Sequence, residues 1–589
     1  MAIALLDTSK REGRGIAAMR GQSSAVNDVE ADPLANPDSA GAFWCAIEGR
    51  EPMSAAQAIC DELVRLIGRR DPQVDRLRAL FALDRHAQLL LERQLLEFAV
   101  APLDSAVKGQ QVRHAVFELS RAFAQAYLHF LEHVRGKRLR GAWIGGVPAI
   151  VVRLLYHRQI ELLLHLLRYE AWPRGRWREL HDAYRLAQEL SPAPALVDSD
   201  GDAQPAITFE HMYARILLTQ LLDTGQFLPP ELAVARKWIA RWSHLVSLRR
   251  LVTAGTTASA GGGFIVDITG ANGLQRISGR PQGECLWLDT APIVAAIDSE
   301  MGALRDSVSV SRARRLALLA RLRKAFAPVP VRVERRGERK PVALTSVQTT
   351  TGGLGSIFAM LRDEWRRRVQ TTSSPVPAVE EISIMDVRRC PPAVALAVQE
   401  DSLSAFPPTA SFGVPQPAWQ VCDRSVSGSR LRGRASNPRR MFPGSLVAFR
   451  SDEDTSWTLA VVRRLKRLPG SNVEVGVEHL GRNPQPMVLT AMHPATPASK
   501  SFPALYLRES SMDVNSRVRT LVVPASHFEP GRVLVMSSAK AEATIRLKGS
   551  LECQSDFVWT TFEVLESAIA GAKPSVGSPE ATVAQASAP

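Results

Sequence analysis

The sequence predicts an α+β protein of several domains, with an all-helical N-terminal half and an antiparallel β-barrel in the C-terminal half. Two observations predict this division. Apolar residues recur at three- and four-residue intervals over most of residues 41–251, where Pro and Gly are sparse, and this spacing is typical of amphipathic helices. From residue 418 onward, short runs rich in Val, Leu and aromatic residues alternate with Gly and Pro turns, which indicates a small antiparallel barrel or sandwich.

The N-terminal half is predicted to be a helical bundle or an array of antiparallel helix pairs. No fixed repeat period supports a particular repeat family. His129 and His133 stand one helical turn apart, but no carboxylate or cysteine partner is identifiable, so we expect packing and no metal site. Helical spacing of apolar residues begins at Leu63 and continues to Phe98. The further helices predicted are 112–134, 150–169, 177–190, 207–223 and 230–248.

The remaining divisions follow from changes in composition. Residues 263–269 and 283–289 are predicted to form a hairpin, and Pro292–Lys324 a long helix. The full organisation predicted is a disordered start over 1–40, a helical domain over 41–251, a linker, hairpin and long helix over 252–325, an arginine loop, first strand and helix over 326–368, a disordered insertion over 369–417, a β-barrel over 418–500, a β-rich extension over 501–567 and a disordered tail over 568–589.

One hexapeptide in the barrel region suggests a binding function. Residues 423–428, Asp-Arg-Ser-Val-Ser-Gly, fit the pattern D-x-S-x-x-G and follow the strand-like run 418–422. Pro443-Gly444 then precedes the strand-like run 445–450, and runs 457–464 and 473–478 follow. The ordered series of strands is more specific than the hexapeptide, because three fixed positions arise easily by chance.

This ordered series resembles the PilZ domain, the bacterial receptor module for cyclic di-GMP, over residues 419 to about 480. The resemblance implies that Asp423, Ser425 and Gly428 form half of a cyclic di-GMP site. Asp423 would accept hydrogen bonds from guanine N1 and N2, and Ser425 would bond a phosphate or fix the loop. Gly428 would allow the backbone to come close to the ligand or to adopt a positive φ.

The family's other motif, R-x-x-x-R, is matched by Arg335 and Arg339, with Arg336 between them. A guanidinium suits guanine O6 and N7, or phosphate oxygens, in a bidentate contact. The 84 positions from Arg339 to Asp423 (423 − 339) exceed the family's usual spacing, which we explain by the insertion 369–417. Arg332/Arg336 and Arg362/Arg366 also fit the pattern; the strand predicted at 341–348 favours Arg335/Arg339.

Composition limits the class of protein. The net charge is +14, but the arginines are scattered over every segment, so we interpret the excess as a compositional bias rather than a nucleic-acid surface. The six cysteines form no C-x-x-C pair, which favours a reduced, cytoplasmic protein. No run is long and apolar enough to predict a membrane span, and no signal peptide is predicted.

No catalytic motif is found, so the protein is expected not to be an enzyme and to need no cofactor. The favoured function is a cytoplasmic receptor that binds cyclic di-GMP and relays its level to an unknown protein partner through residues 41–251. The alternatives are a protein-interaction scaffold with a degenerate, ligand-free barrel, or a nucleic-acid-binding protein. Nucleic acid is the less expected partner, because the strands carry Trp419, Phe449 and Trp457 singly rather than as stacking platforms.

Overall fold

The computed structural model describes residues 32–69, 73–100, 108–135, 146–190, 197, 207–223, 225–251, 263–277, 283–304, 310–329, 340–351, 353–371, 416–434, 441–451, 456–469, 472–491, 501–510, 518–537 and 541–569. The segments predicted to be disordered, 1–40, 369–417 and 568–589, fall mostly outside these residues. The chain divides into two compact units, residues 1–90 and 91–589, which are described in turn.

The first unit is helical. It contains α3 (Pro37–Ile47), α4 (Pro52–Ile67) and the first part of α5 (Val74–Val100), which crosses the division. Asn36 starts α3 because its side chain accepts from the Ser39 N–H at 2.9 Å, which satisfies one of the free donors of the first turn. Ile59 and Leu63 of α4 and Leu80 and Leu83 of α5 are fully buried, as the helical spacing of apolar residues predicts.

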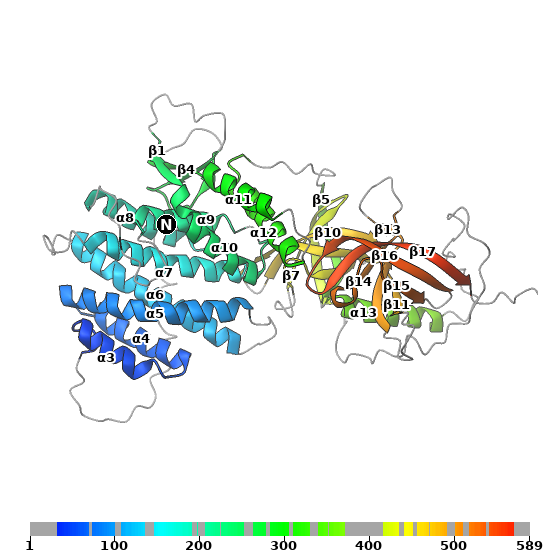
Figure 1. The fold of residues 1–589 in the computed structure, drawn as a ribbon, viewed down its shortest axis with the longest axis horizontal. Coiled ribbons are helices and arrows are strands. Elements are labelled where there is room, and N and C mark those ends of the chain that lie inside the picture. Colours follow the sequence, from blue (N-terminus) through cyan, green and yellow to red (C-terminus); the bar gives the residue numbers. More distant parts are fainter. Residues whose placement is uncertain are drawn as a thin grey trace, which may run out of the picture. The chain divides into compact units, whose positions relative to one another are not determined.

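The second unit begins with a group of helices around a buried central helix, α7 (Val147–Leu167). Figure 1 shows α7 between α6 and α9. The buried Arg158 of α7 is satisfied by Glu161 and Glu179, each at 2.6 Å, so the charge is paired rather than isolated. The other helices are α6 (Lys108–Arg135), α8 (Arg174–Leu190), α9 (Phe209–Gln220) and α10 (Pro229–Trp242).

The predicted helical half is confirmed, with one correction at its end. The helix predicted over 230–248 stops at Trp242, and Ser247–Arg250 forms strand β1. This strand pairs with β4 (Cys285–Asp289), which also pairs with β2 (Phe264–Asp267), and β3 (Gln275–Arg276) completes a four-stranded sheet. The residues of β1 are drawn into the sheet by ladder bonds to a segment far along the chain, a non-local gain that local helical spacing does not show.

The long helix predicted over Pro292–Lys324 is wrong. Two helices are present, α11 (Ala291–Ala303) and α12 (Val310–Phe326). Arg323 of α12 pairs with Asp298 of α11 at 2.6 Å, so the two helices lie side by side. A glycine at 302, next to the last residue of α11, weakens helix formation at this point.

The C-terminal part contains a first closed barrel in which strands follow the order β10-β7-β6-β5-β8-β9, with β10 paired to β9. Its interior includes Trp419, Val421, Leu431 and Phe449. These residues alternate with outward-facing ones, as a barrel requires. The strands are β5 (Lys340–Thr351), β6 (Gln416–Ser425), β7 (Gly428–Arg434), β8 (Leu446–Ser451), β9 (Thr458–Arg467) and β10 (Asn472–Arg482), and β13 (Glu509–Ser510) pairs with β10 outside the ring.

The region predicted as a β-rich extension forms a second closed barrel, which is more than an extension. The segment 485–491, placed by the prediction in the first barrel, belongs to the second, because the chain turns at Asn483 (φ 50°) and Pro484. Asn tolerates this conformation, and Pro lacks the N–H that a continuing ladder needs. The strands, in ring order, are β11 (Gln485–Ala491), β12 (Ser501–Leu507), β14 (Thr520–Pro524), β17 (Phe557–Ile569), β16 (Ala541–Cys553) and β15 (Val533–Ser537).

Helix α13 (Gly353–Thr371) contacts both barrels through one hydrophobic core. Ile357 and Phe358 share this core with Leu459 of the first barrel and with Leu505 and Val522 of the second. Burying an apolar helix face against two barrels stabilises all three elements together. No helix in the described part of the chain combines the length and the hydropathy of a membrane-spanning segment.

Candidate ligand site

The D-x-S-x-x-G motif forms the tight turn between β6 and β7. Ser425 lies directly opposite Gly428, and its hydroxyl donates to the Gly428 carbonyl at 3.1 Å. Val426, at the tip, is 61% exposed. The Ser425 hydroxyl therefore links the two ends of the loop, while Val426 at the tip of the turn is exposed to solvent.

Gly428 is required by a close approach of another strand. A Cβ at this position would lie 2.5 Å from the Val477 carbonyl oxygen of β10, closer than any unstrained side chain can come. Gly428 has no positive φ. The structure thus gives this glycine a packing reason, its contact with β10, and the expected approach of its backbone to the ligand stays a prediction.

Asp423 lies on β6 directly opposite Arg430 of β7. The Arg430 Nε lies 2.8 Å from a carboxylate oxygen of Asp423, and the Asp423 side chain is 13% exposed. The pair fixes the carboxylate at the outer surface of the barrel, beside the turn. Arg430 was not predicted as a site residue, although it stands two positions after the motif glycine, where strand alternation places it on the outer face.

Arg335, Arg336 and Arg339 lie outside the described residues, but the strand that follows them is informative. β5 begins at Lys340, which lies opposite Arg424, and Pro341 lies opposite Asp423. Arg339 is therefore covalently one residue from a position paired with the motif strand. The insertion 369–417 lies between α13 and β6 along the chain, so it does not separate this end of β5 from Asp423.

The alternative arginine pair Arg362/Arg366 lies on α13. Arg362 is 3% exposed, and its Nε lies 3.4 Å from a carboxylate oxygen of Asp363. A buried arginine on a helix that contacts both barrels is poorly suited to bind a nucleotide from solvent. This geometry favours the arginines before β5, and Arg332 of the other alternative lies outside the described residues.

His479 of β10 supports the turn from its other side. Its backbone N–H donates to the Ser427 carbonyl at 2.9 Å, and its ring Nε2 lies 3.0 Å from the Ser429 hydroxyl. Burial and the neighbouring Arg424 lower the pKa of His479 to about 4, since both disfavour the charged imidazolium. His479 was not predicted as a site residue, because it stands 50 positions beyond the turn.

A pH dependence of the turn follows from His479. Because its pKa falls from the ordinary 6.5 to about 4 on folding, the unfolded chain binds more protons than the folded one between these values. The contribution of neutral His479 to the free energy of unfolding is thus complete above pH 6.5 and decreases as the pH falls toward 4. Nuclear magnetic resonance titration of the imidazole should give the low pKa. His479→Gln should reduce the loss of stability over this interval, and an unchanged loss would contradict the assignment.

The helical part of the second unit contacts the first barrel through two backbone hydrogen bonds. The Leu465 and Arg467 N–H groups of β9 donate to the carbonyls of Gly225 at 3.0 Å and Tyr169 at 2.8 Å. Tyr169 is buried among the core residues of the barrel. Gly225 has a φ of +64°, and a Cβ there would clash with the Leu465 carbonyl, so this contact requires glycine.

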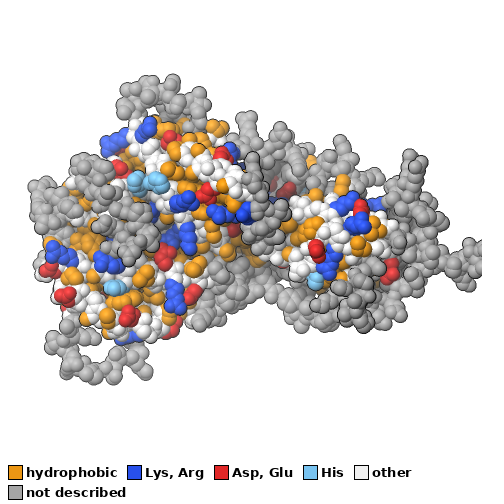
Figure 2. Space-filling model, viewed as in Figure 1, with side chains coloured by type: hydrophobic (Ala, Val, Ile, Leu, Met, Phe, Trp, Pro, Cys, Tyr) orange, Lys and Arg blue, Asp and Glu red, His pale blue; other side chains and the backbone are white. Residues whose placement is uncertain are grey.

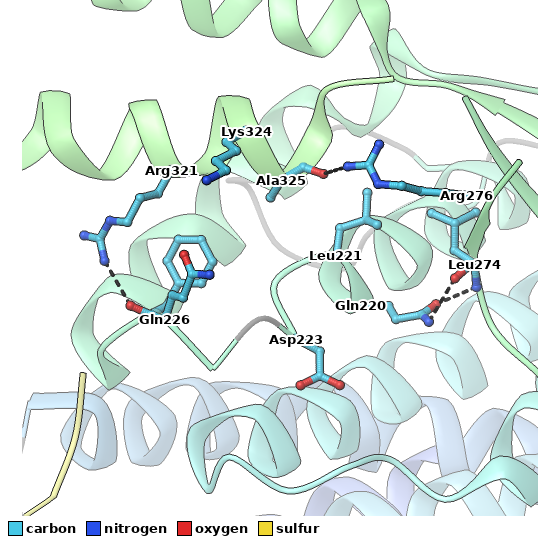
Figure 3. A pocket seen from close by; sticks show the side chains of 10 residues that line it. Gln220, Leu221, Asp223, Gln226, Leu274, Arg276, Arg321, Lys324 and Ala325 are labelled. Carbon is cyan, nitrogen blue, oxygen red and sulfur yellow. Dashed lines mark hydrogen bonds between the residues drawn. The ribbon is translucent and has the colours of Figure 1, made fainter. Parts of the chain in front are cut away.

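A cavity of about 360 Å³ lies behind the segment that carries Gly225. Figure 3 shows it lined by Arg276, Arg321 and Lys324, with Asp223 below. Arg276 donates to the carbonyl of Ala327 at 2.8 Å, and Arg321 pairs with Glu231. Both arginines are therefore engaged by the protein itself, and the cavity is less suited to an anion than its composition suggests.

Charges of both signs are mixed over the surface. Figure 2 shows basic, acidic and hydrophobic side chains interspersed on the visible face rather than one basic patch. No group of three or more metal-binding side chains occurs in the part of the chain that the structure describes. There, Cys45, Cys60, Cys285, Cys422 and Cys553 are free of disulfides, and Cys390 lies outside it.

Comparison with known proteins supports the resemblance to the PilZ family. A family model described as the N-terminal domain of the cyclic-di-GMP receptor FimW matches residues 42–253, and one described as its middle PilZ domain matches residues 397–486. The cyclic-di-GMP receptor FimW of Pseudomonas aeruginosa is 22% identical over 393 residues, which cover 61% of this chain and 63% of that protein. The match thus spans less than two thirds of the relative. No solved structure matches.

Proposed function

The chain contains a PilZ domain in its C-terminal half, and from this premise we propose that it is a receptor for cyclic di-GMP. The observation that carries the proposal is the register of β5 against β6, which pairs Lys340 with Arg424 and Pro341 with Asp423. This register puts Lys340, the residue after Arg339, beside the strand that carries Asp423 and Ser425, which supports a shared site for Arg335, Arg336 and Arg339 with that strand. The two half-motifs can then act on one ligand.

The chemistry of the ligand suits these residues. Cyclic di-GMP has two guanines and two phosphates, so it offers planar edges and anionic oxygens to arginines in bidentate contacts. Asp423 accepts from guanine N1 and N2, and it does so by sharing or exchanging its contact with Arg430. The resulting function is non-catalytic recognition, and a cytoplasmic location is part of the same proposal.

The proposed relay passes through β9. This strand pairs with β10 of the ligand face, and its Leu465 and Arg467 N–H groups bond the helical part at Gly225 and Tyr169. Ordering of the arginine segment by ligand changes the populations of barrel conformations. A protein partner that docks on the helices within 41–251 would respond to that change through this contact.

The direct test is isothermal titration of the full chain with cyclic di-GMP. We expect Asp423→Ala to weaken binding about 100-fold, about 2.7 kcal/mol, because the guanine donors lose a charged acceptor. Arg339→Ala should weaken it about 10-fold or more. Asp75→Ala is a matched control, since it removes an exposed carboxylate paired with Arg78, and its affinity should equal that of the unaltered chain.

The outcomes separate the parts of the proposal. Absence of binding by the unaltered chain would reject the receptor function. Binding that Asp423→Ala and Arg339→Ala leave unchanged would reject the site but keep the receptor. If the chain instead bound single-stranded nucleic acid with a strong dependence on salt and without cyclic di-GMP, the nucleic-acid alternative would replace the proposal. A ligand-free scaffold would bind neither.

A further inference from the structure

Four residues form a row across the outer face of the first barrel. Asp423 of β6 lies opposite Arg430 of β7, Arg430 lies opposite Gly476 of β10, and Gly476 lies opposite Arg464 of β9. Neighbouring strands are about 4.8 Å apart, so the row extends roughly 14 Å from the motif aspartate. The outer surface beside Asp423 therefore continues over three further strands.

At Gly476 no side chain covers the outer surface of β10 in this row. A Cβ at this position would lie 3.3 Å from Nε and 3.6 Å from Nη2 of Arg464, so the Arg464 guanidinium lies over the glycine. Arg464 is exposed, and no hydrogen bond or ion pair joins it to another side chain among the described residues. Its planar group is thus available at the surface, between the position of Arg430 and the edge of β9.

The neighbouring row has a different character. There Arg432 lies opposite Glu474, and Glu474 lies opposite Lys466. Here the side chain of Glu474 stands where the other row has glycine, and its carboxylate, which also lies 3.8 Å from Nη1 of Arg430, would repel phosphate. Two rows with similar cations on β7 and β9 therefore differ at their centre, and only the row that begins at Asp423 leaves space for a planar group over β10.

We propose that Arg464 and Gly476 form a second part of the ligand site, which binds the guanine of the second nucleotide. The inference rests on the proposed cyclic di-GMP function and extends its site to β9. With one guanine edge at Asp423, the rest of the dinucleotide extends along the row. The Arg464 guanidinium then donates to guanine O6 and N7 or stacks on the ring, while Gly476 provides the room.

Titration of cyclic di-GMP into full-length variants tests this assignment. We expect Arg464→Ala to raise the dissociation constant at least 10-fold. Lys466→Ala is the matched control, because it removes an exposed cation two residues along the same strand and on the same face, and we expect less than a 3-fold change. Arg464→Lys should restore little of the loss, since an ammonium cannot form the planar contact.

The unaltered chain separates the two levels of inference. If it does not bind cyclic di-GMP, the proposed function fails first. If it binds and Arg464→Ala binds equally well, only the second part of the site is rejected. An equal loss in Lys466→Ala, or full recovery in Arg464→Lys, would show that charge alone acts at this face and would overturn the assignment to guanine. Circular dichroism of each variant verifies that the barrel is folded.

Discussion

Replacing Tyr169 with Ala should lower the free energy of unfolding by about 3–5 kcal/mol, the usual cost of deleting a buried aromatic side chain. Tyr169 follows α7 in the helical part, yet the residue is 8% exposed and belongs to the same hydrophobic cluster as the core residues of the first barrel. Its hydroxyl donates to the Phe227 carbonyl at 3.1 Å. The substitution removes apolar contacts on the barrel and a hydrogen bond within the helical part.

Denaturation of the full chain by urea measures this effect, with Tyr169→Phe as the matched variant. Tyr169→Phe retains the ring and loses only the hydrogen bond, so we expect a cost of about 1 kcal/mol. Burial raises the pKa of Tyr169, so the hydroxyl remains a donor over the ordinary range of pH. A cost of less than about 1 kcal/mol for Tyr169→Ala would contradict the role of this side chain in the barrel core.

Tyr169→Ala also tests the relay. The substitution should leave the affinity for cyclic di-GMP nearly unchanged, because Tyr169 lies in the core cluster rather than on the outer face that carries Asp423. It should, however, reduce any ligand-dependent change in hydrogen exchange of α7. Equal ligand-dependent protection in both proteins would indicate that the relay uses another contact.

Replacing Glu364 with Ala should destabilise the protein by about 3–5 kcal/mol, the cost of breaking a largely buried ion pair at one partner. Glu364 of α13 accepts from the indole Nε1 of Trp457 and from Arg450, each at 2.7 Å. Trp457 is 3% exposed, and the Arg450 guanidinium lies 4.7 Å from the centre of its ring. Without the carboxylate, the Trp457 indole and the Arg450 guanidinium each lose this acceptor inside the barrel–helix contact.

The matched control for Glu364→Ala is Glu97→Ala. Glu97 pairs with Arg93 on α5 at 3.3 Å, and both side chains are more than half exposed, so we expect a cost below about 1 kcal/mol. Thermal unfolding followed by calorimetry compares the two variants. Similar unfolding temperatures would show that α13 is not anchored through Glu364.

The elements of the ligand turn were predictable because their signals are local. The alternation of apolar residues, the turn glycines and the hexapeptide 423–428 all lie within about sixty residues, and the predicted strands of the first barrel are confirmed. His479 and Arg464 could not be identified in this way, since their relation to the turn depends on how β10 and β9 pair with β7. Such pairing joins positions whose separation in sequence carries no signal.

The arginine motif is a second case in which the sequence could not show which segments come together. The distance of 84 residues between Arg339 and Asp423 raised the question of whether the two half-motifs meet, and only the pairing of β5 with β6 puts Lys340, the residue after Arg339, beside the motif strand. Site roles for Arg335, Arg336 and Arg339 stay predictions. The second barrel was likewise anticipated only as β-rich, because alternating strands do not reveal whether they close on themselves.

Local periodicity and turn chemistry were thus enough for the helical half, the strands of the PilZ domain and the turn that carries Asp423, Ser425 and Gly428. Three features depended on tertiary structure: the closure of two barrels and their shared contact with α13, the approach of β5 to the motif, and the bonds from β9 to Tyr169 and Gly225. The physical reason is that helix formation and tight turns are governed by neighbours along the chain. Strand register and shared cores, in contrast, are decided by side chains that meet only after folding.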